Sequence, residues 1–183
     1  MRGGKLRMLT VLDEFTRECQ CIHVDRKINA GKVRQVMARL IDEHGAPEHI
    51  RSDNGSEFIE YHLREWLATE GIKTLYIDPG SPWQNGYIES FHTRFREECL
   101  NREQLWTLTE APVVIEDWRF KYNHIRPHRS LGYVTPIQFA VLALEASPLT
   151  VPAASVRRSL DFLYNLKETL TPPRLTNYAA QFG

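Results

Sequence analysis

The order of its expected elements predicts that this chain folds as an α/β protein, with a mixed sheet flanked by helices. Two apolar segments, KLRMLTVLDE and CQCIHVDR, have the pattern of β-strands, and the short turn between them predicts an antiparallel hairpin. Helical and strand patterns then alternate along the chain, which is typical of crossover connections in a sheet that packs against helices. At 183 residues and 42% hydrophobic content, the chain suits one domain with a single core.

Each later element follows from its periodicity and from the residue that stops it. Between Ala30 and His44 apolar residues recur at helical spacing, and Gly45 ends the run. The two glycines and two prolines of DPGSPWQNG predict a mobile loop before the next helix. The remaining expected elements are, in order, a strand over 48–53, a helix over 58–70, a strand over 72–77, a helix over 87–100 and a helix over 109–123.

The pattern weakens after Pro148. Prolines 152, 172 and 173 bracket one segment, residues 159–169, for which a helix is considered. We expect residues 148–183 to be a loosely structured C-terminal tail attached to a folded domain over 1–147.

Charge and cysteine content exclude some classes of protein. Lys plus Arg equals Asp plus Glu at 23 each, so net charge gives no information about a nucleic-acid partner. Of the 23 basic residues, 17 are arginines, which suit forked contacts to phosphate. Three cysteines without a CxxC pair indicate neither a disulfide framework nor a zinc site. No run approaches the roughly 20 apolar residues of a membrane span, and the first residues lack the core of a signal peptide. We therefore expect a cytoplasmic protein with reduced thiols.

Two carboxylates, Asp53 and Glu89, lie at the ends of expected elements. Asp53 ends a strand, at the edge where open α/β sheets bind ligands, although it would equally suit an Asx turn with its own backbone. Glu89 begins a helix and would share a face with His92 and Arg96, which suits metal and phosphate; the alternatives are a contact with the helix dipole and a solvated polar face. Because Mg²⁺ prefers oxygen ligands and two-metal sites need several carboxylates, the pair would supply part of a phosphoryl-transfer site.

Basic and aromatic residues alternate over residues 118–134, a stretch without an acidic residue. This composition suits DNA, through phosphate contacts by the arginines and base stacking by the aromatic rings. The alternative is a helix whose aromatic side chains pack in the core while its arginines are solvated. The candidate DNA-contacting residues are Arg126 and Arg129 here, and Trp83 and Asn85 in the proline-rich loop, for which a simple turn with one anchoring aromatic is the alternative.

Four motifs in order resemble bacterial insertion-sequence transposases that share the catalytic core of retroviral integrases. The motifs are LDEFTRE, PEHIRSDNGSEF, PGSPWQNGYIESFHTRFREE and YNHIRPHRSLGYVTPIQF, and the match covers residues 6–139. Four spaced motifs are far more specific than an isolated Asp–Glu spacing. The resemblance implies a ribonuclease-H-like fold and an Asp–Asp–Glu triad that cleaves and transfers DNA strands with Mg²⁺ or Mn²⁺, as two ions in the complete site.

The resemblance assigns roles to four residues. Asp53 falls on the family's second Asp and Glu89 on its Glu, with the matching gap of 35 residues between them, so both are expected to be catalytic and to bind metal. Arg96 takes the family's basic position seven residues after Glu89, and with His92 it is expected to steady the DNA phosphate.

The family's first Asp lies on a central strand that precedes KLRMLTVLDE, whereas this sequence begins at Met1 without that strand. Asp13 is a poor substitute, since it would lie some seven residues along the next strand, roughly 20 Å away. We expect it to order the DEFTR turn instead. The resemblance thus implies an N-terminally truncated integrase/transposase core over 1–147, the product of a second reading frame, whose sheet lacks its central strand.

These observations predict a transposase core in which DNA strand cleavage and transfer are impaired by the loss of the first Asp. Its partners would be element ends and target DNA, and further copies of the chain or full-length transposase; no membrane and no small-molecule substrate are expected. The alternative is a non-catalytic fragment that binds DNA or transposase and modulates transposition. A ribonuclease-H-like junction resolvase is a third hypothesis, against which SPWQNGYIES and RPHRSLGY argue.

Overall fold

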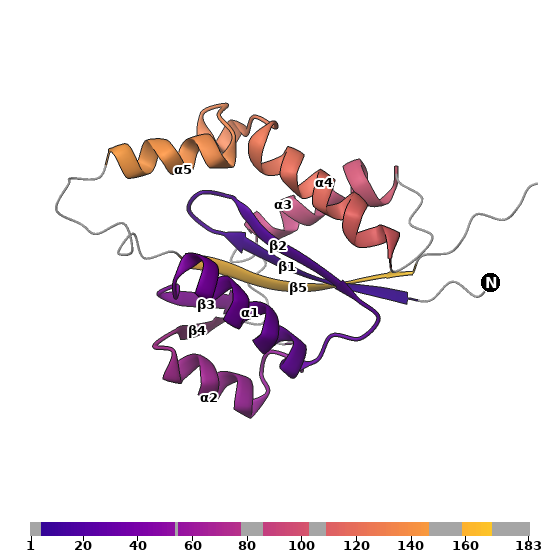
Figure 1. Cartoon of the computed structure of the whole chain (residues 1–183), viewed down its shortest axis with the longest axis vertical. Helices are drawn as coiled ribbons and strands as arrows, with labels where there is room; N and C mark the ends of the chain where they lie inside the picture. Colours follow the sequence, from indigo (N-terminus) through magenta and orange to yellow (C-terminus); the bar gives the residue numbers. More distant parts are fainter. Residues whose placement is uncertain (1–4, 54, 78–85, 103–108, 147–158, 170–183) are drawn as a thin grey trace, which may run out of the picture.

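The computed structural model describes residues 5–53, 55–77, 86–102, 109–146 and 159–169. They form a mixed sheet with helices on both faces, as predicted (Figure 1). The strands are β1 (Lys5–Asp13), β2 (Cys19–Asp25), β3 (His49–Ser52), β4 (Lys73–Tyr76) and β5 (Ser159–Thr169). The helices are α1 (Ala30–His44), α2 (Tyr61–Thr69), α3 (Gly86–Phe95), α4 (Glu110–His124) and α5 (Pro136–Glu145), with a π-helical turn at Arg96–Leu100 and a 3-10 turn at Arg129–Leu131.

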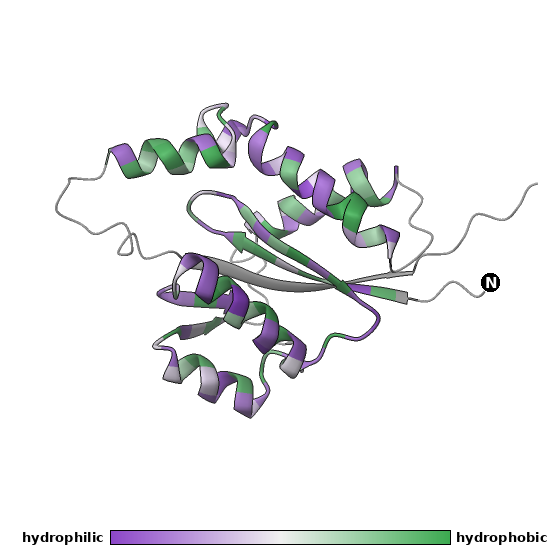
Figure 2. Ribbon diagram, in the orientation of Figure 1, coloured by the Kyte–Doolittle hydropathy of each residue, from purple (hydrophilic) through white to green (hydrophobic). Residues whose placement is uncertain are grey.

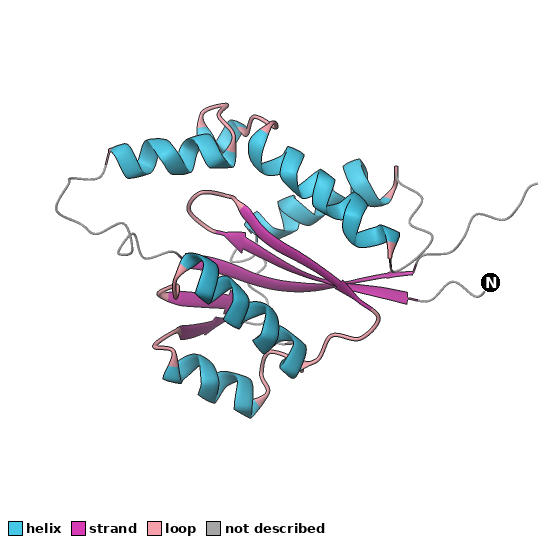
Figure 3. Ribbon diagram, viewed as in Figure 1, coloured by secondary structure: helices cyan, strands magenta, loops and turns pink. Residues whose placement is uncertain are grey.

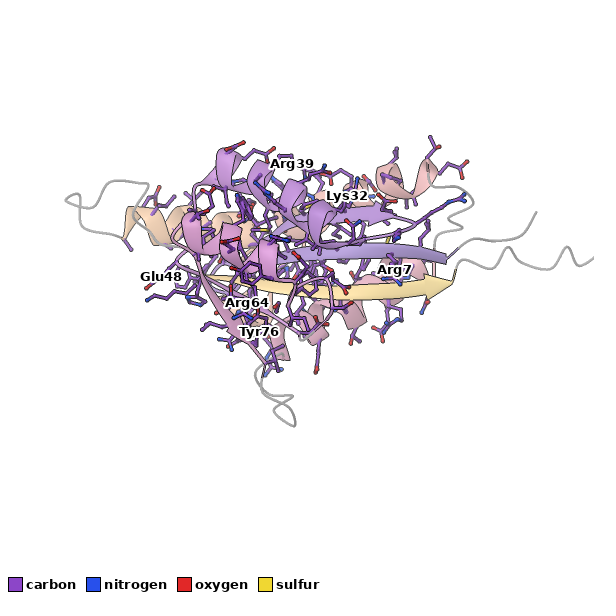
Figure 4. All side chains as sticks on the ribbon, turned by 90° about the horizontal axis from the view of Figure 1, so that it is seen from below. Arg7, Lys32, Arg39, Glu48, Arg64 and Tyr76 are labelled. Atoms are coloured by element: carbon purple, nitrogen blue, oxygen red, sulfur yellow. The ribbon has the colours of Figure 1, made fainter. Side chains whose placement is uncertain are left out.

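β5 lies in the centre of the sheet, although it comes from the C-terminal part of the chain. The strand order is β2-β1-β5-β3-β4. β5 pairs antiparallel with β1 and parallel with β3, while β1 and β2 form the predicted hairpin and β3 and β4 run parallel. Figure 4 shows β5 running alongside β1, the strand that carries Arg7. Residues 159–169 therefore fill the central place that the resemblance assigns to a strand before β1.

The expectation of a loosely structured tail over 148–183 is wrong for Ser159–Thr169, and so is the helix considered there. In the segment SLDFLYNLKET the apolar residues fit alternation as well as helical spacing, so periodicity alone does not distinguish the two. What decides is the sheet: β1 and β3 each offer an edge, and a strand between them satisfies backbone groups on both sides. Residues 147–158 and 170–183 lie outside the described residues.

Helices cover the two faces of the sheet separately (Figures 1 and 3). α1 and α2 pack on one face and α3 and α4 on the other. The core of the α1–α2 face consists of Leu9, Val11, Cys21, Ile28, Val33, Val36, Met37, Leu40, Ile50, Phe58, Leu63, Leu67 and Ile72. The core of the α3–α4 face consists of Leu6, Met8, Leu12, Cys19, Ile22, Val24, Ile88, Phe91, Phe95, Cys99, Ala111, Ile115, Trp118 and Tyr122.

Local signals fix both ends of α1 where the sequence predicts them. The Asn29 Oδ1 accepts a hydrogen bond from the Lys32 N–H at 3.0 Å and so caps the first turn. Gly45 ends the helix with φ of 83°, a conformation that favours glycine. α2 begins three residues later than predicted, because Phe58 belongs to a turn in which its N–H donates to the Gly55 carbonyl at 2.9 Å.

The helix α5 was not predicted, although its start carries a clear signal. The Thr135 hydroxyl accepts from the Gln138 N–H while the Gln138 side chain accepts from the Thr135 N–H, a capping box with Pro136 at the first helical position. Figure 2 shows that α5 is apolar along most of its length. Its residues Val141 and Leu142 are exposed.

None of the described helices is long and apolar enough to cross a membrane. The three cysteines, all within the described ranges, are buried and free.

Candidate active site

Asp53 follows β3 directly, at the carboxyl end of the strand. Its Oδ1 accepts a hydrogen bond from the Gly55 N–H at 3.0 Å, so the Asx turn considered from the sequence is present. A Cβ on Gly55 would lie 3.0 Å from the same oxygen, too close for any side chain without movement. Because the Asp53 side chain is only half-buried, this turn orients a carboxylate that solvent still reaches.

Glu89 lies in the first turn of α3 and is exposed. Two nearby residues of the helix are buried. Ile88 is 0% and Phe91 is 1% exposed, and both belong to the core of the α3–α4 face. The helix is thus fixed against the sheet while the Glu89 side chain stays in solvent, at the helix end where the dipole favours a negative charge.

Sequence analysis missed a contact that holds this end of α3. The guanidinium carbon of Arg17 lies 3.3 Å from the centre of the Tyr87 ring, a cation–π contact between the β1–β2 turn and the start of the helix. Arg17 adopts a left-handed conformation with φ of 64°. No local pattern indicates such a pair, because its members are 70 positions apart.

The prediction that His92 shares the exposed face of Glu89 is wrong. His92 is 5% exposed, and its Nε2 lies 2.8 Å from the Thr10 hydroxyl of β1, in a buried hydrogen bond. Burial, and secondarily the charge of Arg96, lowers the pKa of His92 to about 4. A neutral, buried imidazole is placed to anchor α3 to β1 rather than to grip a phosphate. The missed signal is that Ile88, Phe91, His92 and Phe95 form one helical stripe.

The arginines predicted to contact DNA differ in their surroundings. Arg96 is exposed in the π-helical turn after α3, and Arg129 is exposed in the 3-10 turn after α4. Arg126 instead forms an ion pair with Glu98, which joins the segment after α4 to the π-helical turn. Trp83 and Asn85 lie outside the described residues.

The aromatic residues of α4 divide between core and surface. Trp118 and Tyr122 are buried and pack against Phe91, with ring centres 5.5 and 5.0 Å from it, so core packing is right for these two. Phe120 is exposed and stacks on His124 with ring centres 4.2 Å apart.

Asp13 orders the β1–β2 turn, as predicted. Its Oδ1 accepts hydrogen bonds from the N–H groups of Phe15 and Thr16 at 2.9 and 2.8 Å, and the residue is 1% exposed. Asp13 is paired with Leu160 of β5, which is itself paired with Ile50 of β3, three residues before Asp53. Its burial and its turn hydrogen bonds argue against a role as a metal ligand.

The donor set fits a hard divalent cation. Asp53 and Glu89 offer carboxylate oxygens, the ligands that Mg²⁺ and Mn²⁺ prefer. Among the side chains that the structure describes, no three from His, Cys, Asp and Glu gather closely enough to hold a metal ion. The described side chains therefore supply two carboxylates of such a site.

Fold and site together define a class of protein: a ribonuclease-H-like domain with one acidic residue at the carboxyl end of β3 and another in the first turn of α3. Solved structures share this fold. The integrase catalytic core of HTLV-2, solved with magnesium in a trimeric form, superposes with a TM-score of 0.57 at 19% identity, covering 73% of this chain and 84% of that one. A simian T-cell lymphotropic virus intasome, solved with the PP2A regulatory subunit B56 gamma, gives 0.63 at 16% identity, covering 80% and 50%.

Sequence comparison identifies the family. Two family models described as integrase core domain match residues 1–82 and 70–136. A 39.2 kDa protein of insertion element IS476 from Xanthomonas euvesicatoria is 44% identical over 136 residues, which are 74% of this chain and 39% of that protein. A 31.7 kDa protein of IS407 from Burkholderia multivorans is 40% identical over 152 residues, 83% and 54% respectively. The chain belongs to the bacterial insertion-sequence transposases with an integrase-type core, and it spans about half or less of the length of these relatives.

Proposed function

We propose that this chain is the catalytic core of a DNA transposase, which cleaves a strand at the element end and joins it to target DNA with the help of divalent cations. The observation that carries the proposal is the placement of Asp53 and Glu89. One carboxylate follows a strand of the sheet, and the other begins the helix that packs on the sheet. Both side chains reach solvent, as ligands that must meet DNA need to do.

In this proposal, two carboxylates would bind the cations and one arginine would bind DNA. Asp53, oriented by its turn with Gly55, and Glu89, oriented by the burial of Ile88 and Phe91, would hold the cations. Bound Mg²⁺ or Mn²⁺, two ions in the complete site, would stabilise the charge that develops on the phosphate and on the entering and leaving oxygens. Arg96, exposed two turns after Glu89, would contact a phosphate of the bound strand.

The site would carry out two phosphoryl-transfer steps with the same side chains and cations. In the first, a water oxygen bonds to phosphorus and the bond from phosphorus to the 3′ oxygen breaks, which leaves a 3′-hydroxyl on the element end. In the second, that hydroxyl loses its proton and attacks a target phosphate, and a target 3′ oxygen leaves. The second step conserves the number of phosphodiester bonds, so no external energy source is required.

The test is Mn²⁺-dependent nicking of terminal-repeat DNA by the full chain. We expect nicking by the unmodified chain and a loss of at least about 100-fold in Asp53→Asn and Glu89→Gln, the order of effect seen when a group that stabilises transition-state charge is removed. Asp117→Asn is the matched control, since this exposed acid of α4 pairs with Lys121. Nicking that persists in both site variants would contradict the proposal.

Binding without cleavage would favour the non-catalytic fragment predicted as the alternative. It is measured by fluorescence anisotropy of terminal-repeat DNA at two salt concentrations, because phosphate contacts make affinity fall with salt. A chain that binds and never nicks, with any divalent cation, would sink the catalytic proposal and retain the DNA-binding one. Cleavage of four-way junctions in preference to terminal repeats would point to the resolvase hypothesis instead.

A further inference from the structure

The strand at the centre of the sheet, β5, carries acidic residues in its sequence. β5 contains two acidic residues, Asp161 near its start and Glu168 near its end. Asp161 pairs with Leu12 of β1 on one side and with Arg51 of β3 on the other. Arg51 precedes Asp53 by two residues, so Asp161 and Asp53 come from adjacent strands at the same end of the sheet.

Strand alternation gives the face on which position 161 lies. Directly paired residues of neighbouring strands lie on the same face of a sheet, and residues alternate between faces along each strand. Leu12 belongs to the core that includes Ile88 and Phe91 of α3. On β3, Ile50 belongs to the opposite core, so Arg51 lies on the α3 side as well. Both neighbours therefore place position 161 on the face that α3 covers, and α3 contacts β5.

The separation suits two ligands of one metal centre. Position 161 is one strand spacing, about 4.8 Å, from Arg51, and Asp53 is two residues further along at about 3.3 Å each, which places the two Cα atoms roughly 8 Å apart. Backbone positions at this separation allow two carboxylates to share a cation. Glu168, paired with Leu6, lies seven residues away along β5, roughly 23 Å from position 161.

Two other acids near this end of the sheet, Asp13 and Glu14 among the described residues, are already engaged. Asp13 lies on the α1–α2 face, because it continues the alternation of Leu9 and Val11. Its carboxylate accepts hydrogen bonds within the turn. Glu14 forms ion pairs with Arg51 at 2.8 Å and with His49 at 3.7 Å. The Glu14 pair also offsets the positive charge that Arg51 would otherwise bring to a cation site.

We propose that Asp161 is the third carboxylate of the metal site, supplied by the C-terminal strand β5 from the centre of the sheet. This proposal rests on the function proposed above and replaces the expectation that the chain lacks its third ligand. It makes residues 159–169 part of the active site rather than an appendage. Metal binding would then draw on β3, α3 and β5, so the site would form only when β5 is in the sheet.

The test measures Mn²⁺ binding by isothermal titration calorimetry on the full chain, without DNA. We expect Asp161→Asn to weaken Mn²⁺ binding at least about tenfold, the size of loss that even an outer-shell partner produces. Asp53→Asn and Glu89→Gln should weaken it likewise. The matched control is Glu168→Gln, an acid removed from the same strand, which should leave the affinity unchanged. Circular dichroism checks that each variant is folded.

The outcomes separate this proposal from the proposed function. If Asp53→Asn and Glu89→Gln weaken Mn²⁺ binding while folded Asp161→Asn does not, the role of Asp161 is overturned and the proposed function stands. If none of the three substitutions weakens Mn²⁺ binding, the proposed metal site itself is contradicted.

A second measurement needs no variant, in case Asp161→Asn does not fold. Fe²⁺ replaces Mn²⁺ in the unmodified chain, and ascorbate with peroxide then generates hydroxyl radicals that cut the backbone beside the ion. Cuts near residues 53, 89 and 161, suppressed by excess Mg²⁺, are expected. Cuts near 53 and 89 alone would overturn the proposal.

Discussion

The two faces of the sheet are built from different side chains. The α1–α2 face is mainly aliphatic, with Val33, Val36, Met37 and Leu40 of α1 packed on the sheet. On the α3–α4 face the helices contribute a cluster of aromatic rings, in which Phe91 and Phe95 of α3 meet Trp118 and Tyr122 of α4 with ring centres 4.8 to 5.5 Å apart across the two helices.

The α3–α4 face also contains directional polar contacts. His92 and Thr10 join α3 to β1. Asn123 of α4 forms two hydrogen bonds with the backbone of Cys19, each 2.9 Å long. Aliphatic packing stabilises a fold but tolerates small rotations, whereas buried hydrogen bonds fix one orientation. These hydrogen bonds from α3 and α4 lie on the face that orients Glu89.

Removing β5 is expected to have the largest effect, because both faces pack on a sheet with β5 at its centre. A chain that ends at residue 147 exposes an edge of β1 and an edge of β3. We expect it to aggregate or to lose its cooperative unfolding transition, as measured by size-exclusion chromatography and by circular dichroism during urea titration. The control is a chain that ends at residue 170 and keeps β5. A monomeric, cooperatively folded 1–147 chain would contradict the central role of β5.

Truncating one core residue on each face of the sheet tests whether the two faces contribute differently to stability and to activity. Phe91→Ala should lower the free energy of unfolding by about 3–5 kcal/mol and Leu40→Ala by about 2–5 kcal/mol, because both side chains are almost fully buried. Only Phe91→Ala should also lower nicking per folded molecule, since it loosens the helix that orients Glu89. Urea unfolding measures the loss of stability. Nicking assays under conditions where both variants are folded measure the loss of activity. Equal loss of nicking in the two variants would remove the distinction between the faces.

Acid should destabilise the α3–α4 face through His92. Its pKa is about 4 in the folded chain, below the ordinary value of 6.5, so between these values the unfolded chain binds a proton that the folded chain does not. The resulting stability is present above pH 6.5 and is lost as the pH falls toward 4, by on the order of 3 kcal/mol.

His92→Gln should flatten this part of the pH profile in urea unfolding, while His124→Gln, at an exposed position, should not. Burial also lowers the pKa values of His23 and His128, so some slope remains in either variant. Identical profiles for the unmodified chain and His92→Gln would show that His92 is not buried in solution.

The smallest expected effect is on DNA affinity. Arg129→Ala should weaken binding of terminal-repeat DNA modestly and reduce the slope of affinity against salt by about one, as the loss of one phosphate contact does. Arg64→Ala is the control from the other face; its guanidinium lies 5.6 Å from the ring centre of Tyr76 (Figure 4). Anisotropy titrations at several salt concentrations measure both. An equal effect of the two variants would show that DNA does not prefer the α3–α4 side.

Local patterns predicted most of the chain, because their signals lie within the elements themselves. Gly45 and Asn29 mark the ends of α1, and the alternation in β2 is complete within one strand. The place of β5 could not be predicted in this way. Its partners β1 and β3 are more than 100 residues away in sequence, and the preference for a strand arises only when two sheet edges are available.

The site was predicted where motifs mark the ends of elements and mispredicted where burial decides. Asp53 and Glu89 lie where the sequence indicates. The spacing of His92 from Glu89 predicts a shared polar face. The same residue also fits the apolar stripe of Phe91 and Phe95, and in the structure it lies on that stripe. Asp13 orders the turn that the sequence indicates.

The most direct test of the proposed site is the position of Mn²⁺ in crystals of the full chain, determined from anomalous scattering. We predict density within coordination distance of Asp53 and Glu89, with Asp161 as the third carboxylate on the same face of the sheet. Mn²⁺ that binds elsewhere, or that contacts neither Asp53 nor Glu89, would contradict the proposed active site.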